Sequence, residues 1–408
     1  MRGFFLDKIA ARAAKFSANE RRAALIAGGV HALHDGYTDL IYIMLPLWQG
    51  EFGLSYAALG LLRGAFVGVM ASLQIPAGLL SERIGAAAVL ALGSALAGLG
   101  YCVAGLSGGF AMLLVALVIG GFGSSAQHPV ASALVARAFA GPRSLKALGT
   151  YNFAGDLGKM TVPATLSLML LAIGWRPALA MLGGVGLAMA AVVLAFTPRF
   201  DRGPMRDVRE APPRADRAPR PYAFGLLLWI GILDSATRMG FLLFLPFVLR
   251  AKGASLQDVG LAMTLVFAGG AVGKLACTFI GARIGAIGTV WLTESLTALG
   301  ILVLLPLPLP AALLLLPPIG IALNGTSSVL YGSVPDLVAA DWRTRALSLF
   351  YTGTIGSGAI APIVFGRIGD AFGIPHALIL VAGVALLTLP VAALLRPALA
   401  RGYGTGAA

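Results

Sequence analysis

The chain has 408 residues, of which 58% are apolar and 12% are charged, and its mean hydropathy is +0.88. Soluble globular domains carry about 25% charged residues, so this composition excludes a soluble protein and indicates an all-α membrane protein. The net charge of +13 does not indicate nucleic-acid binding, because the basic residues lie mostly between apolar segments and form no patch with aromatic residues.

Residues 1–22 combine large apolar side chains with arginines and lysines. This pattern predicts a short amphipathic helix on the cytoplasmic membrane surface, with a solvated tail as the alternative. The apolar segment that follows contains His31 and Asp35 and has no small-residue cleavage site. We therefore do not expect a cleaved signal peptide.

Twelve segments are long and apolar enough to cross a bilayer, which takes roughly 20 residues per helix. A proline- and arginine-rich linker, residues 198–221, separates the first six from the last six. We therefore expect an N-terminal bundle (23–197), a C-terminal bundle (222–396) and a cytoplasmic tail (397–408). The predicted spans are residues 23–48, 56–79, 86–106, 109–137, 148–173, 177–197, 222–249, 256–281, 286–307, 310–337, 346–368 and 375–396.

The two halves resemble each other when one is shifted by 200 positions. Such a repeat predicts two pseudo-symmetric six-helix bundles. After a two-residue slip, Arg143 also corresponds to Arg345. The other matches include Leu45-Pro46 with Leu245-Pro246, Gly53 and Ser55 with Gly253 and Ser255, and Arg83-Ile84-Gly85-Ala86 with Arg283-Ile284-Gly285-Ala286.

The basic residues predict the orientation of the chain in the membrane. If both termini lie on one side, 22 of the 30 lysines and arginines share that side and four lie on the other. Lysine and arginine are enriched in cytoplasmic loops. We therefore expect a multi-pass protein of a bacterial-type inner membrane with both termini in the cytoplasm.

Polar and ionisable residues inside the spans are costly in a bilayer, so they generally face a cavity or a partner. They are concentrated in particular spans, and this distribution predicts a polar cavity between the halves, with the third, sixth, ninth and twelfth spans facing lipid. Glu294 in the ninth span is the exception, and we assign it no role. The candidate solute-binding residues are His34, Asp39, Arg63, Gln127, Asn152, Asp156, Lys159, Asp234, Arg238, Lys274, Asn324 and Tyr331.

Asp35 is the predicted proton-binding carboxylate, because no lysine or arginine lies beside it at helical spacing. His31 and His128 are candidate proton relays. The four bases within the spans favour an anionic or zwitterionic solute over a cation. The spacings Asp156–Lys159 and Asp234–Arg238 are equally compatible with local ion pairs.

Twelve spans, a six-plus-six repeat and a basic linker resemble the major facilitator superfamily. The signature loop of that family, Gly-x-Leu-Ala-Asp-Arg-x-Gly-Arg-Lys/Arg, corresponds here to Gly78 through Gly85, with Glu82 in place of Asp and without the final basic pair. The resemblance implies a twelve-helix transporter that works by alternating access, is monomeric and needs no cofactor. It implies gating roles for Gly78, Glu82, Arg83, Gly85, Arg283, Arg143 and Arg345.

Within this superfamily, the N-terminal half is similar to the fosmidomycin-resistance-type permeases. The similarity lies in His31-x-x-x-Asp35, in Leu45 through Ser55 and above all in Gly121 through Pro129. It implies proton-coupled transport of small organic molecules, often outward. The charged pair Asp156 and Lys159 replaces a neutral pattern in these relatives, so the resemblance does not extend to the solute.

Two other functions are considered. His31, His34, Asp35 and Asp39 offer imidazole and carboxylate ligands, to which His128 could add another, and they favour a transition-metal permease as the alternative, although four nearby bases would repel a cation. An enzyme is not expected, because the sequence contains no nucleophile elbow, phosphate-binding glycine loop or zinc motif.

Overall fold

The computed structural model describes residues 17–139, 142–198, 221–339 and 342–400. These residues form helices, connected by short turns. In the first half the helices are α2 (Ala18–Phe52), α3 (Tyr56–Ser72), α4 (Gln74–Ile84), α5 (Ala86–Gly105), α6 (Phe110–Ser124), the π-helix η1 (Gln127–Ala131), α7 (Ser132–Ala138), α8 (Pro142–Ala172) and α9 (Trp175–Phe196). In the second half they are α10 (Pro221–Ala251), α11 (Leu256–Leu304), α12 (Leu309–Ser333), the 3₁₀ helix η2 (Val334–Asp336), α13 (Arg343–Phe372) and α14 (Ile374–Ala400).

Each predicted span corresponds to helix in the described part of the chain. Helices α3 and α4 form one span with a 45° bend, and α6, η1 and α7 form another. Helix α11 contains two spans that meet at Gly285, whose backbone angles (φ 75°, ψ 171°) interrupt the helix. Among the described residues, eight helices are apolar and long enough to cross a membrane, or nine with the bent pair. Helices α2 and α8 fall outside this set because both carry ionisable residues near their middles.

The backbone preserves the internal repeat. Gly53 and Gly253 have φ of 61° and 88°, and Gly85 and Gly285 have φ of 97° and 75°. Glycine tolerates this left-handed region without steric cost, so each pair makes the same turn in both halves. The following helices also begin alike: the side chains of Ser55 and Ser255 accept backbone hydrogen bonds three residues ahead, at 3.1 Å in each case.

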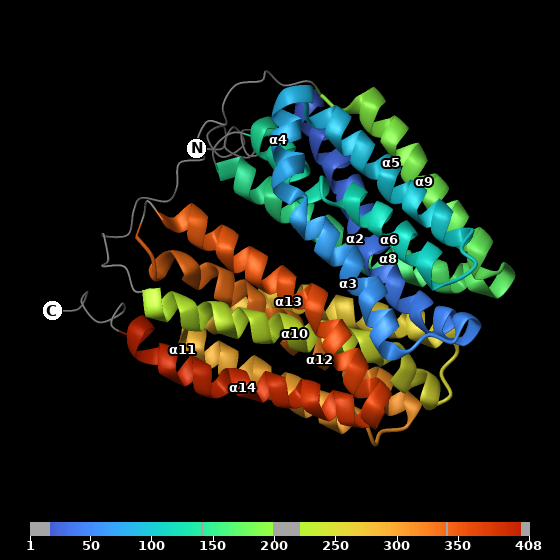
Figure 1. The fold of residues 1–408 in the computed structure, drawn as a ribbon. Helices are drawn as coiled ribbons and strands as arrows, with labels where there is room; N and C mark the ends of the chain where they lie inside the picture. Colours follow the sequence, from blue (N-terminus) through green and yellow to red (C-terminus); the bar gives the residue numbers. More distant parts are fainter. Residues whose placement is uncertain (1–16, 140–141, 199–220, 340–341, 401–408) are drawn as a thin grey trace, which may run out of the picture.

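Helices α2 to α9 form one bundle and α10 to α14 the other, and the two diverge towards the end where α2 begins and α14 ends (Figure 1). At the opposite end they touch along α3 and α13, and along α8 and α11. The Asp370 carboxylate accepts hydrogen bonds from the backbone N–H groups of Tyr56 (2.7 Å) and Ala57 (3.0 Å). Gln257 donates to the Ser167 carbonyl at 3.0 Å. We call this region the closed end.

Glycines allow the backbones to approach at the closed end. A methyl group on Gly60 would lie 2.3 Å from the carbonyl oxygen of Pro362, and one on Gly64 would lie 2.2 Å from that of Ala359. Both separations are far below a van der Waals contact, so only glycine fits here. The mutual packing of α3 and α13 therefore depends on the absence of two methyl groups.

Three expectations about chain segments lie wholly or partly outside the described residues: the amphipathic helix, for residues 1–16, the linker, for residues 199–220, and the cytoplasmic tail, for residues 401–408. Where the chain is described again, Ser17 and Glu20 form a reciprocal capping box that begins α2 at Ala18. The ninth span differs from the lipid-facing expectation in one respect. Its Glu294 is buried, with 1% of its surface exposed, and it contacts α12.

Candidate functional site

Asp35 on α2 lies at the centre of a buried charged cluster. Its carboxylate oxygens lie 3.4 Å from Nζ of Lys159 on α8 and 3.4 Å from Nε2 of His31. His34 Nε2 is 3.8 Å away. The base that the sequence did not place beside Asp35 thus comes from another helix.

The backbone carbonyl of Tyr151 determines which nitrogen of His31 carries a proton. This carbonyl lies 2.8 Å from His31 Nδ1 and can only accept, so Nδ1 is the donor. In a neutral ring Nε2 then carries a lone pair, and it faces the Asp35 carboxylate. Two acceptors in contact attract each other only if a proton lies between them. The His31–Asp35 contact is therefore a place where a proton can bind.

His128 from η1 completes a cluster of three histidines. Its ring meets those of His31 and His34 edge-on, with centroids 5.3 and 4.9 Å apart. The ligand atoms of His31, Asp35 and His128 lie within 4.8 Å of one another. Asp39, which the sequence suggested as a further metal ligand, instead pairs with Arg63 at 3.7 Å. If a metal binds, the set is therefore His31, Asp35 and His128.

A second ion pair crosses between the bundles. Nζ of Lys274 on α11 lies 2.5 Å from the Asp156 carboxylate on α8. The local Asp156–Lys159 pair suggested by the spacing is wrong as an ion pair, because Lys159 reaches Asp35 and Asp156 reaches the other bundle. The side chains of Lys159 and Lys274 are 29% and 38% exposed, so neither ammonium group is fully enclosed by the protein.

The remaining candidate residues differ in how deeply they are buried. Arg63 is 1% exposed and its guanidinium lies over the Tyr42 ring at 5.0 Å. The local Asp234–Arg238 pair is present, at 2.8 Å. Asn324 donates to the Gly320 carbonyl at 3.2 Å, and the Tyr331 hydroxyl lies 3.3 Å from that of Thr354. Asn152 is exposed on α8.

Most candidate gating residues lie near the end of a helix or near the break in α11 at Gly285. Arg143 pairs with Glu20 at 3.1 Å, which connects the beginnings of α8 and α2. Glu82, Arg83, Arg283 and Arg345 are exposed. Gly78 lies in α4, and a methyl group added to it would lie 3.8 Å from Cβ of Pro129. Gly85 is the C-cap residue of α4.

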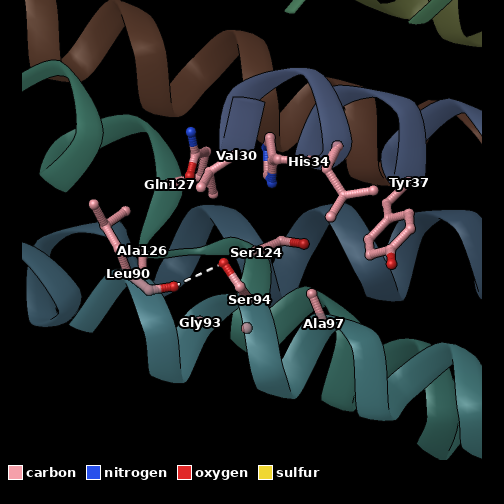
Figure 2. A pocket seen from close by; sticks show the side chains of 12 residues that line it. Val30, His34, Tyr37, Leu90, Gly93, Ser94, Ala97, Ser124, Ala126 and Gln127 are labelled. Atoms are coloured by element: carbon pink, nitrogen blue, oxygen red, sulfur yellow. Dashed lines mark hydrogen bonds between the residues drawn. The ribbon is translucent and has the colours of Figure 1, made fainter. Parts of the chain in front are cut away.

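A cavity of about 20 Å³ lies within the N-terminal bundle, behind His34 (Figure 2). It is lined by Ser124 and Gln127, whose Oγ and Nε2 atoms have no hydrogen-bond partner among the described residues. One water molecule needs about this much space and several polar partners. The cavity suits a water beside His34 and is far too small for an organic solute.

Three residues with notable contacts in the structure were assigned no role from the sequence. Tyr151 acts through its carbonyl and through a ring stacked on His31 at 4.1 Å, and a backbone group leaves no mark in a sequence. Asp370 was overlooked because it lies beyond the predicted span. Glu294 carried a signal, as a lone acid in an apolar span, but its partners lie on other helices.

Comparison with known proteins identifies the family. The model of the Major Facilitator Superfamily matches residues 28–232 and again 227–405. The chain is 26% identical to a probable sulfoacetate transporter of Cupriavidus necator, covering 83% of this chain and 85% of that protein. It is 24% identical to the fosmidomycin resistance protein of Escherichia coli, covering 64% and 65%.

Among solved structures, a bacterial homologue of the human lysosomal transporter Spinster has the same fold, with a TM-score of 0.78 and 16% identity over 93% of this chain and 97% of that one. The twelve-helix fold and the resemblance to fosmidomycin-resistance-type permeases are thus confirmed. The protein is a multi-pass membrane protein and a secondary transporter, and it belongs to the Major Facilitator Superfamily.

Proposed function

We propose that the protein moves a small organic anion across the inner membrane in exchange or symport with protons. The contact of Asp35 with both Lys159 and His31 supports this most directly. This contact brings together Lys159, a base that can bind an anion, and the Asp35–His31 pair, which can hold a proton.

Competition for Lys159 supplies the coupling. An anionic solute that binds the Lys159 ammonium withdraws it from Asp35. The carboxylate then lies in a low-dielectric environment without its base, where the protonated form is favoured. His31 delivers or removes that proton, and His128 extends the relay. Solute binding and proton binding are thereby linked in free energy.

Lys274 supplies an anion contact from the opposite bundle. An anion held by Lys159 and Lys274 would touch both halves of the molecule, as alternating access about a central site requires. The name of the sulfoacetate transporter, an organic-anion carrier, supports this solute class. The name of an MFS-type efflux pump of Mycolicibacterium smegmatis, to which the chain is 27% identical over 86% of its length, supports export.

The closed end then faces outwards. With both termini in the cytoplasm, as the basic residues indicate, the ends at which the bundles diverge (Figure 1) face the cytoplasm, as in an inward-open state. The protein would act as a monomer, since each chain has both bundles. The exposed gating residues lie on the side that must close in the other half of the cycle.

The proposal is tested by proton flux in proteoliposomes containing the wild-type protein. Organic anions, cationic drugs and divalent metals are added one at a time while internal pH is followed. We expect organic anions to move protons and cations not to do so, with protein-free vesicles as the control. A rate of solute movement that does not change with an imposed pH gradient would refute proton coupling.

Lys274→Gln is expected to raise KM for the transported anion by about 10- to 150-fold, since hydrogen bonds to charged groups contribute about 1.5–3 kcal/mol. Lys146→Gln is the control, because Lys146 is exposed at the start of α8. Concentration dependence of initial uptake rates measures both. An unchanged KM in Lys274→Gln would remove this residue from the solute site.

A divalent-metal permease is the second candidate, and the His31–Asp35–His128 cluster favours it. Histidine and carboxylate ligands suit first-row metals. The Lys159 ammonium, 3.4 Å from Asp35, would have to move away first. Metal-driven proton movement that is lost in His128→Ala would establish this function instead.

A further inference from the structure

The charged residues near the middles of the described helices do not balance. The bases are Arg63, Lys159, Arg238 and Lys274. Each pairs with one carboxylate: Asp39, Asp35, Asp234 and Asp156, respectively. A fifth acid, Glu294, remains, and the described residues supply it with no base of its own.

Glu294 lies in a completely enclosed site between α10, α11 and α12. Its Oε1 accepts a hydrogen bond from the Thr326 hydroxyl at 2.8 Å, and Thr326 in turn contacts Thr293 at 2.7 Å. Its Oε2 has no hydrogen-bond donor among the described residues. Its carboxyl group nevertheless lies within hydrogen-bonding reach of the Asp234 carboxyl.

Two carboxyl groups in contact cannot both be ionised in a buried site, so one of them holds a proton. Asp234 already pairs with Arg238 at 2.8 Å, which favours its ionised form. Glu294 lacks such a base, and as an acid it would satisfy its unpartnered oxygen by donating to Asp234. One proton then makes the five acids and four bases neutral in sum.

Apart from Arg238, the described groups around the pair carry no charge. Helix α10 contributes Asp234 and Arg238, and α12 contributes Thr326 and, next to Arg238, the Tyr331 hydroxyl. Helix α14 also packs against α11, but its ionisable residues, His376 and Arg396, lie towards its two ends.

From this juxtaposition we propose that Glu294 and Asp234 form a second proton-binding site, in the C-terminal bundle, with the proton carried by Glu294. Arg238 connects the site to the protein surface, because its side chain is 22% exposed. An anion that binds Arg238 weakens its pairing with Asp234, so Asp234 then holds the shared proton more strongly. The use of this site in transport rests on the proposed function, but the presence of its proton does not.

Infrared spectroscopy of the purified protein at neutral pH tests the site without any transport assay. We expect a protonated carboxyl band in the wild type that disappears in Glu294→Gln, an isosteric change. The band should persist in Asp35→Asn and in the control Glu51→Gln, which alters a partly exposed acid paired with Arg176. No band in the wild type, or one that survives in Glu294→Gln, would overturn the proposal.

Thr326→Val provides a second test, and its expected result is one that a change in folding alone would not produce. It removes the hydroxyl that donates to Glu294 Oε1, so the carboxyl band should shift to higher frequency. An unchanged frequency would overturn the assignment of the proton to Glu294. If wild-type vesicles move solute without protons while the band is present and responds to both variants, the proposed coupling is wrong and this site stands.

Discussion

Asp35→Asn is expected to abolish solute-driven proton movement while the protein still reaches the membrane. The amide cannot exchange a proton with His31, and it no longer draws Lys159 away from the solute. Proteoliposomes that report solute and internal pH together measure the effect. We expect the ratio of protons to solute to fall to the background of protein-free vesicles.

This variant has a second effect that must be separated from the first. Lys159 loses its ion-pair partner, and because its side chain is 29% exposed, the cost stays below the ~3–5 kcal/mol of a fully buried unpaired charge. The double variant Asp35→Asn with Lys159→Gln removes both charges and should restore thermal stability without restoring proton movement. If Asp35→Asn retains wild-type coupling, Asp35 is not the proton-binding group of the N-terminal bundle.

Gly60→Ala is expected to separate the bundles at the closed end by the addition of one methyl group. That methyl would lie 2.3 Å from the Pro362 carbonyl oxygen, and overpacking of this kind costs about 1–3 kcal/mol. Such a cost shifts a two-state equilibrium by roughly 5- to 150-fold. The inward-open state should lose population to one in which α3 and α13 lie apart.

Spin labels measure this shift directly. Gly50 and Ala251 are exposed at the closed ends of α2 and α10, and cysteines there, in a background without Cys102 and Cys277, report the separation of the bundles. Gly356→Ala is the control, since this glycine lies on α13 with no atom within 4 Å of an added methyl group. A distance distribution that is the same in Gly60→Ala and the control would refute the role of this contact.

The fold could be predicted from the sequence because its causes are local. Span length follows from the number of consecutive apolar residues, and the repeat follows from glycines and serines that impose the same turns and helix starts at positions 200 residues apart. Gly53 with Gly253 and Gly85 with Gly285 all adopt positive φ, which glycine tolerates without steric cost. The membrane class, the two bundles and the candidate polar residues could therefore be predicted from the sequence before any contact was known.

The pairing of charged side chains was decided by the tertiary structure alone. Asp35 looked unpaired because its base lies on α8, and Asp156 looked paired with Lys159 although its partner lies in the other bundle. Helical spacing describes neighbours on one helix, whereas an ion pair in a low-dielectric interior forms wherever packing brings opposite charges together. Among the described residues, the same packing leaves Glu294 without a base of its own, and this is the observation behind the proposed second proton-binding site, whereas the sequence could only mark Glu294 as an exception.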